Sequence, residues 1–498
     1  MIGQIKIAMH RSLLLLGMFP KIIQLSLIVL LGIIIGGLFF LVNPLLLLVA
    51  ISGLLVLIII SYLKPEIGIL TTAVLISSIV FEYELPLIPL PFGAFHISDI
   101  ILLSLLVSIL IKSYFTDNFK FHSTPLDRPL VLFYLAAVLS IYTSIAEYGV
   151  DFRTAMKFLR PTTYYLIFFA ITNLIQGKKQ IKFLIKGLSI IAIVVGISMI
   201  VQAIIGSSVR LVPGRVEGAK VFEQAYEATR IIPPGSIVLY LGLIISICTI
   251  VLINKPLFKS TYIYSTPILI GGIILTYFRM YWVTIIFLLS IFIILISKRN
   301  KMKFMAWFST ILIVLSILSL AFLSLGGRPR AYVNSISARF SSLFSGEKIY
   351  GSDTLEFRRR ENSYALAQIA KHPLIGIGLA TDYRPFDPFL SAGPLWFMHN
   401  GYLWILMKTG FIGFLPFCWF YLRFIKRSYS NWKKVKDLVL RSALVGFMLA
   451  AVGLLLINII DPMFMLWPQI VVISIMIGLG EAIIKIKNPD EEKLSGLS

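Results

Sequence analysis

Cysteine and charged residues are both scarce in this chain of 498 residues. The two cysteines, Cys248 and Cys418, fall inside apolar stretches, which excludes a disulfide framework or a thiolate metal site. Charged residues make up 14% of the sequence, far below the level of soluble domains, while hydrophobic residues make up 58% and the mean hydropathy is +0.92. This balance predicts a polytopic membrane protein.

Apolar stretches long enough to cross a bilayer recur along the sequence. Lys6, Arg11 and Lys21 precede the first stretch, which is longer than a signal-peptide core and is therefore interpreted as a retained span. The stretches lie at about 22–42, 45–63, 67–81, 98–115, 129–146, 160–175, 184–206, 235–253, 263–278, 280–297, 304–325, 401–424, 438–460 and 465–485. Because they are continuous rather than alternating, we expect an all-α integral membrane protein with about fourteen (12–14) transmembrane helices.

Basic residues predict the orientation of these helices. Lys255 and Lys259 precede the stretch 263–297, and Lys298 and Arg299 follow it. Both flanks are therefore expected in the cytoplasm, with an even number of crossings between them. Arg279 would then lie at the outer tip of a tight hairpin. The same parity places both termini inside.

Two connections between apolar stretches are long, at 207–234 and 326–400, and by parity both face outward. We therefore expect a transmembrane bundle at 1–325 with an outer loop at 207–234. A large extracytoplasmic loop domain at 326–400 would join the eleventh helix to the twelfth. The C-terminal helices and a short cytoplasmic tail would occupy 401–498.

Lysine and arginine are distributed differently over the two predicted sides. The inner loops 178–186, 298–303 and 426–437 are rich in lysine, so topology and anionic lipid explain most of the net charge of +22, and no nucleic-acid partner is expected. The outer loops carry Arg210, Arg215, Arg230, Arg328, Arg330, Arg339, Arg358, Arg359, Arg360 and Arg384. Planar guanidinium groups suit paired contacts with phosphate oxygens, which favours a phosphorylated ligand. The alternative is that these arginines pair with outer carboxylates in a folded cap.

A histidine precedes the apolar stretch in "PLWFMHNGYLWILMKTGFIGF", residues 394–414. Asn400 is suited to cap a helix that starts at Gly401, so His399 would lie at the positive end of that helix. This position disfavours the imidazolium form and suits a general base. A structural hydrogen-bonding role is the alternative, and it is the commoner one for a histidine at the start of a helix.

Residues 358–379, "RRRENSYALAQIAKHPLIGIGL", and the later "HNGYLWILMKTGFIG" resemble the signature region of the bacterial O-antigen ligase and O-antigen polymerase superfamily. The matching features are Arg360 four residues before Tyr364, a Pro-x-x-Gly-x-Gly turn at 373–378, and His-Asn before a helix that carries Gly-x-x-Gly. These motifs extend the resemblance over roughly residues 265–425.

The resemblance implies a catalytic role for His399 and pyrophosphate contacts for Arg279 and Arg360. Members often have Ser-Arg-Gly where this chain has Phe-Arg-Met, so only Arg279 itself carries over. A further arginine is expected after the seventh span, and both Arg215 and Arg230 could fill that place. Arg230 is favoured because the turn Pro233-Pro234-Gly235 would fix it at the start of the eighth helix.

The implied activity is that of a membrane glycosyltransferase on the outer face of the bacterial cytoplasmic membrane, in lipopolysaccharide or cell-surface polysaccharide biosynthesis. Its donor would be a glycan on undecaprenyl pyrophosphate, and its acceptor a hydroxyl on the lipid A core or on a second lipid-linked glycan. Arginines would replace a metal ion, so no metal or other cofactor is expected. A transporter or flippase of lipid-linked oligosaccharide is the alternative, but the polar groups concentrate in outer loops rather than at mid-membrane.

Five further positions carry smaller expectations. Gly376 and Gly378 are expected to serve a turn rather than to cradle phosphate with their amides. Gly410, with Gly413, is expected to permit close helix packing. Asp461 is expected to end a helix.

Overall fold

The computed structural model describes residues 44–85, 87–90, 93–116, 119, 121–219, 228–253, 256–345, 354–390 and 394–486. The predicted span 22–42, the N-terminus and the C-terminal tail beyond residue 486 lie outside these residues. The chain divides into two compact units, one formed by Met1–Gly68 and Leu85–His122, the other by Ile69–Glu84 and Ser123–Ser498. Helix α3 (Pro65–Leu75) crosses the boundary in the sequence.

The first unit contains two packed apolar helices, α2 (Pro44–Leu63) and α4 (Ile97–Phe115). Hydroxyl groups join them, because the Oγ atoms of Ser61 and Ser104 lie 2.9 Å apart and Ser108 Oγ donates to the carbonyl of Ile58 at 3.3 Å. Strands β1 (Ile88–Leu90) and β2 (Gly93–Phe95) form a small antiparallel hairpin before α4.

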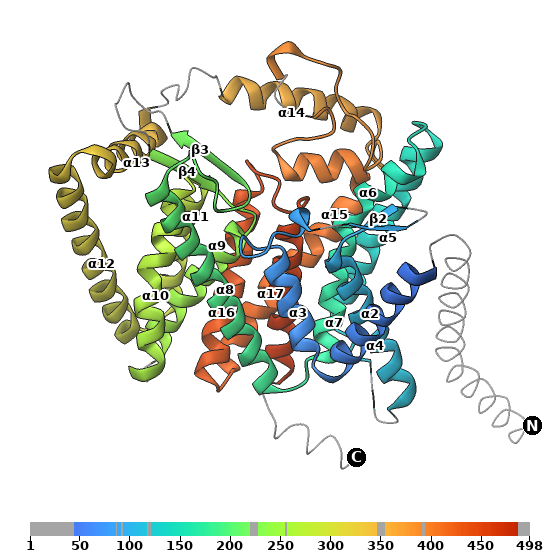
Figure 1. The fold of residues 1–498 in the computed structure, drawn as a ribbon, viewed down its shortest axis with the longest axis horizontal. Coiled ribbons are helices and arrows are strands. Elements are labelled where there is room, and N and C mark those ends of the chain that lie inside the picture. Colours follow the sequence, from blue (N-terminus) through green and yellow to red (C-terminus); the bar gives the residue numbers. More distant parts are fainter. Residues whose placement is uncertain are drawn as a thin grey trace, which may run out of the picture. The chain divides into compact units, whose positions relative to one another are not determined.

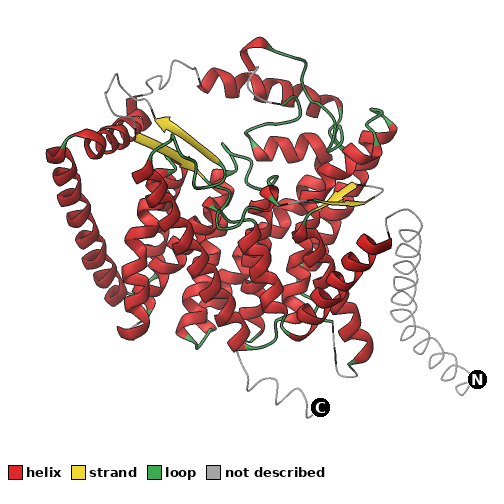
Figure 2. Ribbon diagram, viewed as in Figure 1, coloured by secondary structure: helices red, strands yellow, loops and turns green. Residues whose placement is uncertain are grey.

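The second unit is mainly helical, with one further hairpin (Figures 1 and 2). Its strands β3 (Arg215–Ala219) and β4 (Ala228–Ile232) are antiparallel. Its helices are α5 (Asp127–Ala146), α6 (Phe152–Thr163), α7 (Ile167–Leu174), α8 (Lys178–Ile205), α9 (Ser236–Leu252), α10 (Pro256–Leu275), α11 (Arg279–Leu295), α12 (Lys298–Leu325), α13 (Gly327–Ser345), α14 (Thr354–Lys371), α15 (Gly401–Asn431), α16 (Leu438–Ile457) and α17 (Trp467–Lys485).

Helices α9, α16 and α17 form the core of the second unit. Every residue of α9 from Ser236 to Val251 is buried, and α17 is buried along its whole apolar window. Small residues allow close approach here, since a Cβ atom on Gly446 of α16 would meet the backbone of Ile245 of α9 at 3.2 Å. Close packing at small residues is how helices associate where lipid supplies no hydrophobic driving force.

The predicted apolar stretches from 45–63 onward fall on helices, with two interruptions. The stretch 67–81 is helical only to Leu75, and 160–175 is broken into α6 and α7, with Pro161 near the end of α6. Seven helices in the described part of the chain are long and apolar enough to cross a membrane, or eight if a bent pair counts as one span. Three shorter apolar helices, in α9, α10 and α11, add to these. The total of fourteen stays a prediction.

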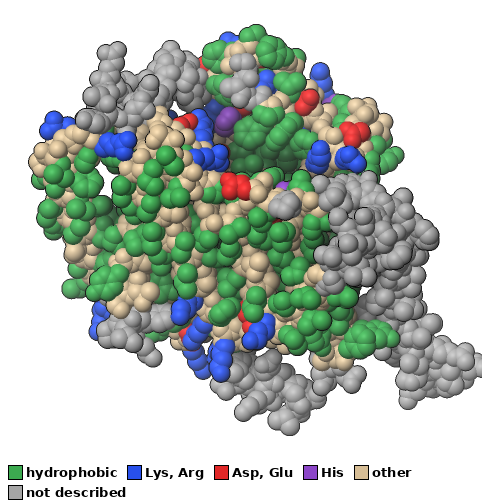
Figure 3. Space-filling model, in the orientation of Figure 1, with side chains coloured by type: hydrophobic (Ala, Val, Ile, Leu, Met, Phe, Trp, Pro, Cys, Tyr) green, Lys and Arg blue, Asp and Glu red, His purple; other side chains and the backbone are tan. Residues whose placement is uncertain are grey.

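The lysine-rich loops and most of the arginines predicted to face outward lie at opposite ends of the second unit. Lys182 near the start of α8 pairs with Asp437 just before α16, which brings two of the lysine-rich loops together. The arginines at 215, 230, 328, 358–360 and 384 lie at the other end, in the region of β3–β4, α13 and α14. Basic side chains gather at both ends in Figure 3, with a largely hydrophobic band between them. This is the surface of a membrane-embedded bundle with two polar ends.

The described parts of the two long connections contain regular secondary structure. Residues 207–234 contain the β3–β4 hairpin, and residues 326–400 contain α13, α14 and the 3₁₀ turn Pro388–Leu390. Within the described residues, the two short hairpins are the exceptions to the expected all-α fold.

Candidate functional site

His399 lies where the sequence places it, directly before helix α15. Asn400 caps that helix, because its side chain accepts hydrogen bonds from the amides of Tyr402 and Leu403, each at 3.1 Å. The predicted cap is therefore confirmed. The cap fixes the backbone at the start of α15 and so limits where the imidazole of His399 can point.

Glu361 of α14 holds the ring of His399. Its two carboxylate oxygens lie 3.1 and 2.9 Å from Nδ1 of His399, and the amide of His399 also donates to Oε2 at 3.4 Å. The side chain of Glu361 is only 3% exposed, whereas that of His399 is 31% exposed. An ionised carboxylate can only accept, so Nδ1 carries the proton of the neutral ring and Nε2 is left as the basic atom.

Arg358 lies on the same face of α14 as Glu361, three residues earlier. Its guanidinium donates to the carbonyl of Ile460, in the turn that follows α16. Burial lowers the pKa of Arg358, and the carboxylates of Glu361 and Asp461 oppose that shift. Arg279 lies close enough to lower the pKa of Arg358 further. Two guanidinium groups and two carboxylates thus share one region beside His399.

Asp461 is a second carboxylate in this region, and it follows α16 by a short turn. Burial raises its pKa, while His399 and Arg358 act in the opposite direction. The expected position near the end of a helix is confirmed, since the amide of Asp461 donates to the carbonyl of Ile457 at 2.9 Å. No pattern in the sequence predicts that Asp461 lies near His399.

Arg279 is the first residue of α11, at the tip of the α10–α11 hairpin, as the sequence predicts. Its Nη1 donates to Ser342 Oγ of α13 at 3.1 Å. Tyr277, in the same turn, has a positive φ of 51°, which is uncommon for a residue other than glycine. The turn is therefore tightly constrained around the arginine.

Arg230 lies beside the same turn, in strand β4. Its Nε donates to the carbonyl of Thr276 at 3.3 Å, and its Nη1 contacts Glu217 at 3.0 Å. Arg215 contacts the other oxygen of Glu217 at 2.6 Å, but its side chain is 65% exposed against 19% for Arg230. Arg230 is thus the better anchored of the two alternatives, and it donates to the backbone of the α10–α11 turn.

Arg360 takes part in a different set of contacts on α14. Its Nε donates to Glu356 at 3.0 Å, its Nη1 lies 3.9 Å from Asp387, and its guanidinium lies 4.4 Å from the ring centre of Phe389. The contacts of Arg360 do not include His399 or Glu361. Of the three consecutive arginines, Arg358 is the one whose surroundings include Glu361. Arg215, Arg230 and Arg360 each contact a carboxylate, as the alternative interpretation of the outer arginines expects.

The two glycine motifs form one interlocked support for the site. Helix α15 is kinked at Gly410, and the amides of Phe411 and Ile412 donate to the carbonyls of residues 373 and 374 at 2.9 and 3.1 Å. In return, the amides of Ile377 and Gly378 donate to the carbonyls of residues 407 and 408, at 2.9 and 3.1 Å. These amides are therefore engaged within the protein, which supports the turn interpretation of the Pro-x-x-Gly-x-Gly motif.

Steric contacts explain why glycine occupies these positions. Gly378 has a φ of +92°, and a Cβ atom there would lie 2.2 Å from Ser144 Oγ of α5. Gly410 has a φ of +60°, and its Cβ would lie 2.1 Å from the carbonyl oxygen of Leu374. Lys408 is fully buried at this junction and donates to the carbonyl of Thr381. The junction fixes the connection from α14 to α15, and hence Glu361 relative to His399.

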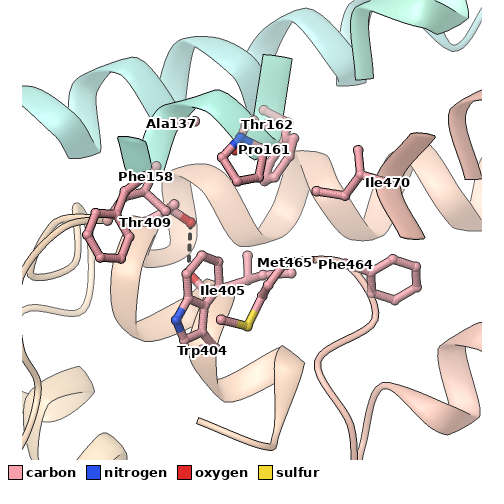
Figure 4. Close-up of a pocket in the computed structure, with 12 residues that line it drawn as sticks. Ala137, Phe158, Pro161, Thr162, Trp404, Ile405, Thr409, Phe464, Met465 and Ile470 are labelled. Carbon is pink, nitrogen blue, oxygen red and sulfur yellow. Dashed lines mark hydrogen bonds between the residues drawn. The ribbon is translucent and has the colours of Figure 1, made fainter. Parts of the chain in front are cut away.

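A small cavity lies further along α15, away from the charged groups. Its volume is about 20 Å³, and its lining includes Phe158, Pro161, Trp404, Thr409 and Met465. Figure 4 shows Pro161 and Thr162 of α6 across this space from Trp404 and Met465. A volume of this size can hold roughly one water molecule and no sugar. Within the described residues, no group of three or more His, Cys, Asp or Glu side chains could hold a metal ion.

The apolar helices and their two charged ends define a multi-pass membrane protein whose candidate site lies at one end of the bundle. Residues 265–418 match the family model described as O-antigen ligase, which supports the resemblance to the O-antigen ligase and polymerase superfamily. No curated protein matches the chain. The matched residues include Arg279, Arg360 and His399, whereas Arg215 and Arg230 precede them. The family supports a membrane glycosyltransferase-like role in polysaccharide biosynthesis, with a lipid-linked glycan and an acceptor as partners.

Proposed function

We propose that the protein transfers a glycan from undecaprenyl pyrophosphate to an acceptor hydroxyl, on the outer face of the bacterial cytoplasmic membrane. The observation that carries this proposal is the position of His399, held at Nδ1 by the buried carboxylate of Glu361, which also acts on Arg358. A base at neutral pH and nearby cations are the two requirements of this reaction.

In the proposed step, Nε2 of His399 takes the proton of the acceptor hydroxyl. The hydroxyl oxygen attacks the anomeric carbon of the donor sugar, and the bond from that carbon to the pyrophosphate oxygen breaks. Undecaprenyl pyrophosphate leaves with the electron pair of the broken bond. Glu361 does not touch the reacting atoms. It positions the imidazole and stabilises the imidazolium that forms, as a carboxylate does for a catalytic histidine in other enzymes.

Arginines are proposed to neutralise the leaving pyrophosphate. Arg279 and Arg230 lie on either side of the α10–α11 turn, and Arg358 lies near Arg279. Arg360 stays a predicted contact, although it must exchange Glu356 for phosphate to serve in this way. Glu217 contacts both Arg215 and Arg230, which holds the two guanidinium groups close together.

Purified protein in detergent or liposomes tests this proposal, with a glycan on undecaprenyl pyrophosphate as donor. Two acceptors, lipid A core and a second lipid-linked glycan, separate a ligase from a polymerase. Transfer to either acceptor supports the proposal, and the same rate in the presence of EDTA supports arginines in place of a metal ion. Movement of intact donor between leaflets without any transfer would favour a flippase instead.

A further inference from the structure

A row of aromatic side chains runs through His399 and is not used by the proposed proton transfer. We call it the aromatic row; it consists of Phe389, Phe357, Phe397, Trp396 and Phe158. Its members come from separate segments: the 3₁₀ turn Pro388–Leu390, helix α14, the segment before α15, and helix α6. Segments that are far apart in the sequence therefore contribute rings to one continuous series of aromatic contacts.

The spacing of the rings is continuous on both sides of the imidazole. On one side, Phe357 lies 5.7 Å from His399 and 6.5 Å from Phe389, between ring centres. On the other side, Phe397 lies 5.1 Å from His399, Trp396 lies 5.9 Å from Phe397, and Phe158 lies 5.1 Å from Trp396. His399 is thus the middle member of a six-ring path.

Most neighbouring rings in the path are nearly perpendicular. The interplanar angles are 83° and 81° for the two contacts of His399, and 83° and 85° for the contacts of Trp396. An edge-to-face contact uses one face of one ring only. The rings are therefore not stacked face to face along most of the path.

Burial distinguishes the row from the aromatic core of the bundle. Phe168 and Phe420 are 0% and 2% exposed, whereas all five members of the row are partly or largely exposed. Met398 lies between Phe397 and His399 in the sequence. Its side chain is 0% exposed, so it anchors this segment to the interior of the protein. Partly exposed aromatic side chains beside reactive polar groups are typical of a ligand site.

We propose that the aromatic row binds the sugar rings of the substrate glycan, a proposal that rests on the proposed glycosyl transfer. A pyranose has apolar C–H faces and a polar edge of hydroxyls, which matches aromatic faces bordered by polar groups. Glu356 and Asp387 supply such acceptors beside Phe389, through their contacts with Arg360. A plain polyprenyl chain would gain nothing from these carboxylates.

The two arms of the row are assigned to the two substrates. Arg360 stacks over Phe389, and Phe357 directly precedes Arg358, so this arm runs beside phosphate-binding groups and takes the donor sugar. The arm of Phe397, Trp396 and Phe158 leads toward α6 and takes the acceptor glycan. The bond would then form between them, beside Nε2 of His399.

Binding of a lipid-free oligosaccharide to the purified full-length protein tests the proposal without requiring turnover. The probe is an oligosaccharide released by mild acid from the surface polysaccharide of the source strain, and saturation-transfer NMR with titration measures its affinity. Trp396→Ala and Phe158→Ala should each weaken binding by about 2- to 10-fold, the scale of one aromatic contact. Trp396→Phe should retain most of the affinity. Trp396→Leu keeps the apolar bulk of the side chain but has no aromatic ring, so it should lose most of the affinity. A loss in this variant would show that the effect of Trp396→Ala does not come from a folding defect.

Phe386→Ala is the matched control, because Phe386 lies in the same connection and is 70% exposed but is not a member of the row. Wild-type affinity in Trp396→Leu and Phe158→Ala, or an equal loss in Phe386→Ala, would overturn the proposal. So would displacement of the oligosaccharide by undecaprenyl phosphate that bears no glycan. Oligosaccharide binding that depends on Trp396, in a protein that shows no transfer, would support the aromatic row and count against the transfer reaction. Transfer that is unaffected by substitutions in the aromatic row would support the reaction and count against the row.

Discussion

Glu361 presents both of its carboxylate oxygens to Nδ1 of His399, from a side chain that is almost wholly buried. The relationship joins helix α14 to the start of helix α15, which are separated in the sequence by a long connection. It gives the histidine a defined orientation and a defined tautomer, the two properties that distinguish a catalytic base from a histidine with only a structural hydrogen bond.

Glu361→Gln should lower turnover by roughly 10²- to 10⁴-fold, because the amide can donate to Nδ1 and so favour the wrong tautomer. Donor affinity should change little, since Glu361 does not contact the donor. Glu361→Asp, which keeps the charge, should recover part of the activity. Turnover at saturating donor and donor titration separate these effects. A wild-type rate in Glu361→Gln would exclude the positioning role.

Arg279→Lys keeps the positive charge but loses the planar fork, so it should reduce both donor affinity and turnover, by roughly 10- to 100-fold in kcat/KM. Charge on the leaving pyrophosphate grows toward the transition state, which explains the effect on turnover. Arg215→Lys is the control, because the side chain of Arg215 is mostly exposed and contacts Glu217. Equal losses in the two variants would argue against a specific role of Arg279.

Gly378→Ala should destabilise the protein, by more than about 2 kcal/mol, through strain at positive φ and contact with Ser144. Gly149→Ala separates the two causes, since Gly149 also has a positive φ, of +65°, but has open space around it. We expect its loss to be only about 1 kcal/mol. Thermal unfolding of both purified variants measures the difference. Similar midpoints would show that the interlocked junction tolerates a side chain.

Helix ends and turns of this site could be predicted because their signals are local. Asn400 is a strong cap, and the aromatic residues around Arg279 mark the end of a hairpin, so both positions followed from a few neighbouring residues. The positive-φ turn at Gly376 and Gly378 likewise followed from the residue type.

The pairings within the site could not be predicted, because they depend on how distant segments meet. Glu361 was one of several outer carboxylates, and no spacing connects it with His399. Arg358 was one of three consecutive arginines, and the family pattern points to Arg360 instead. The i,i+3 spacing of Arg358 and Glu361 on one helical face was the one local sign that they belong together. The paired strands β3 and β4 have no strong strand pattern in the sequence, so this segment is expected only as a loop.

The orientation of the bundle can be tested by labelling with a membrane-impermeant thiol reagent. Ala367→Cys, on the exposed surface of α14, should be labelled in intact cells. Ser430→Cys, exposed at the lysine-rich end of α15, should be labelled only after the inner membrane is permeabilised. The native Cys248 is buried and Cys418 lies within α15, which limits their background. The reverse pattern would place the site in the cytoplasm.

The most direct measurement compares His399→Ala with the wild-type protein in two assays, donor binding and transfer at saturating donor. Removal of the proton acceptor should lower turnover by about 10²- to 10⁴-fold, while donor affinity stays close to wild type because the arginines remain. Membrane level and thermal stability of the variant serve as folding controls. An active His399→Ala protein, or one that is inactive only because it no longer binds the donor, would contradict the assignment of His399 as the base.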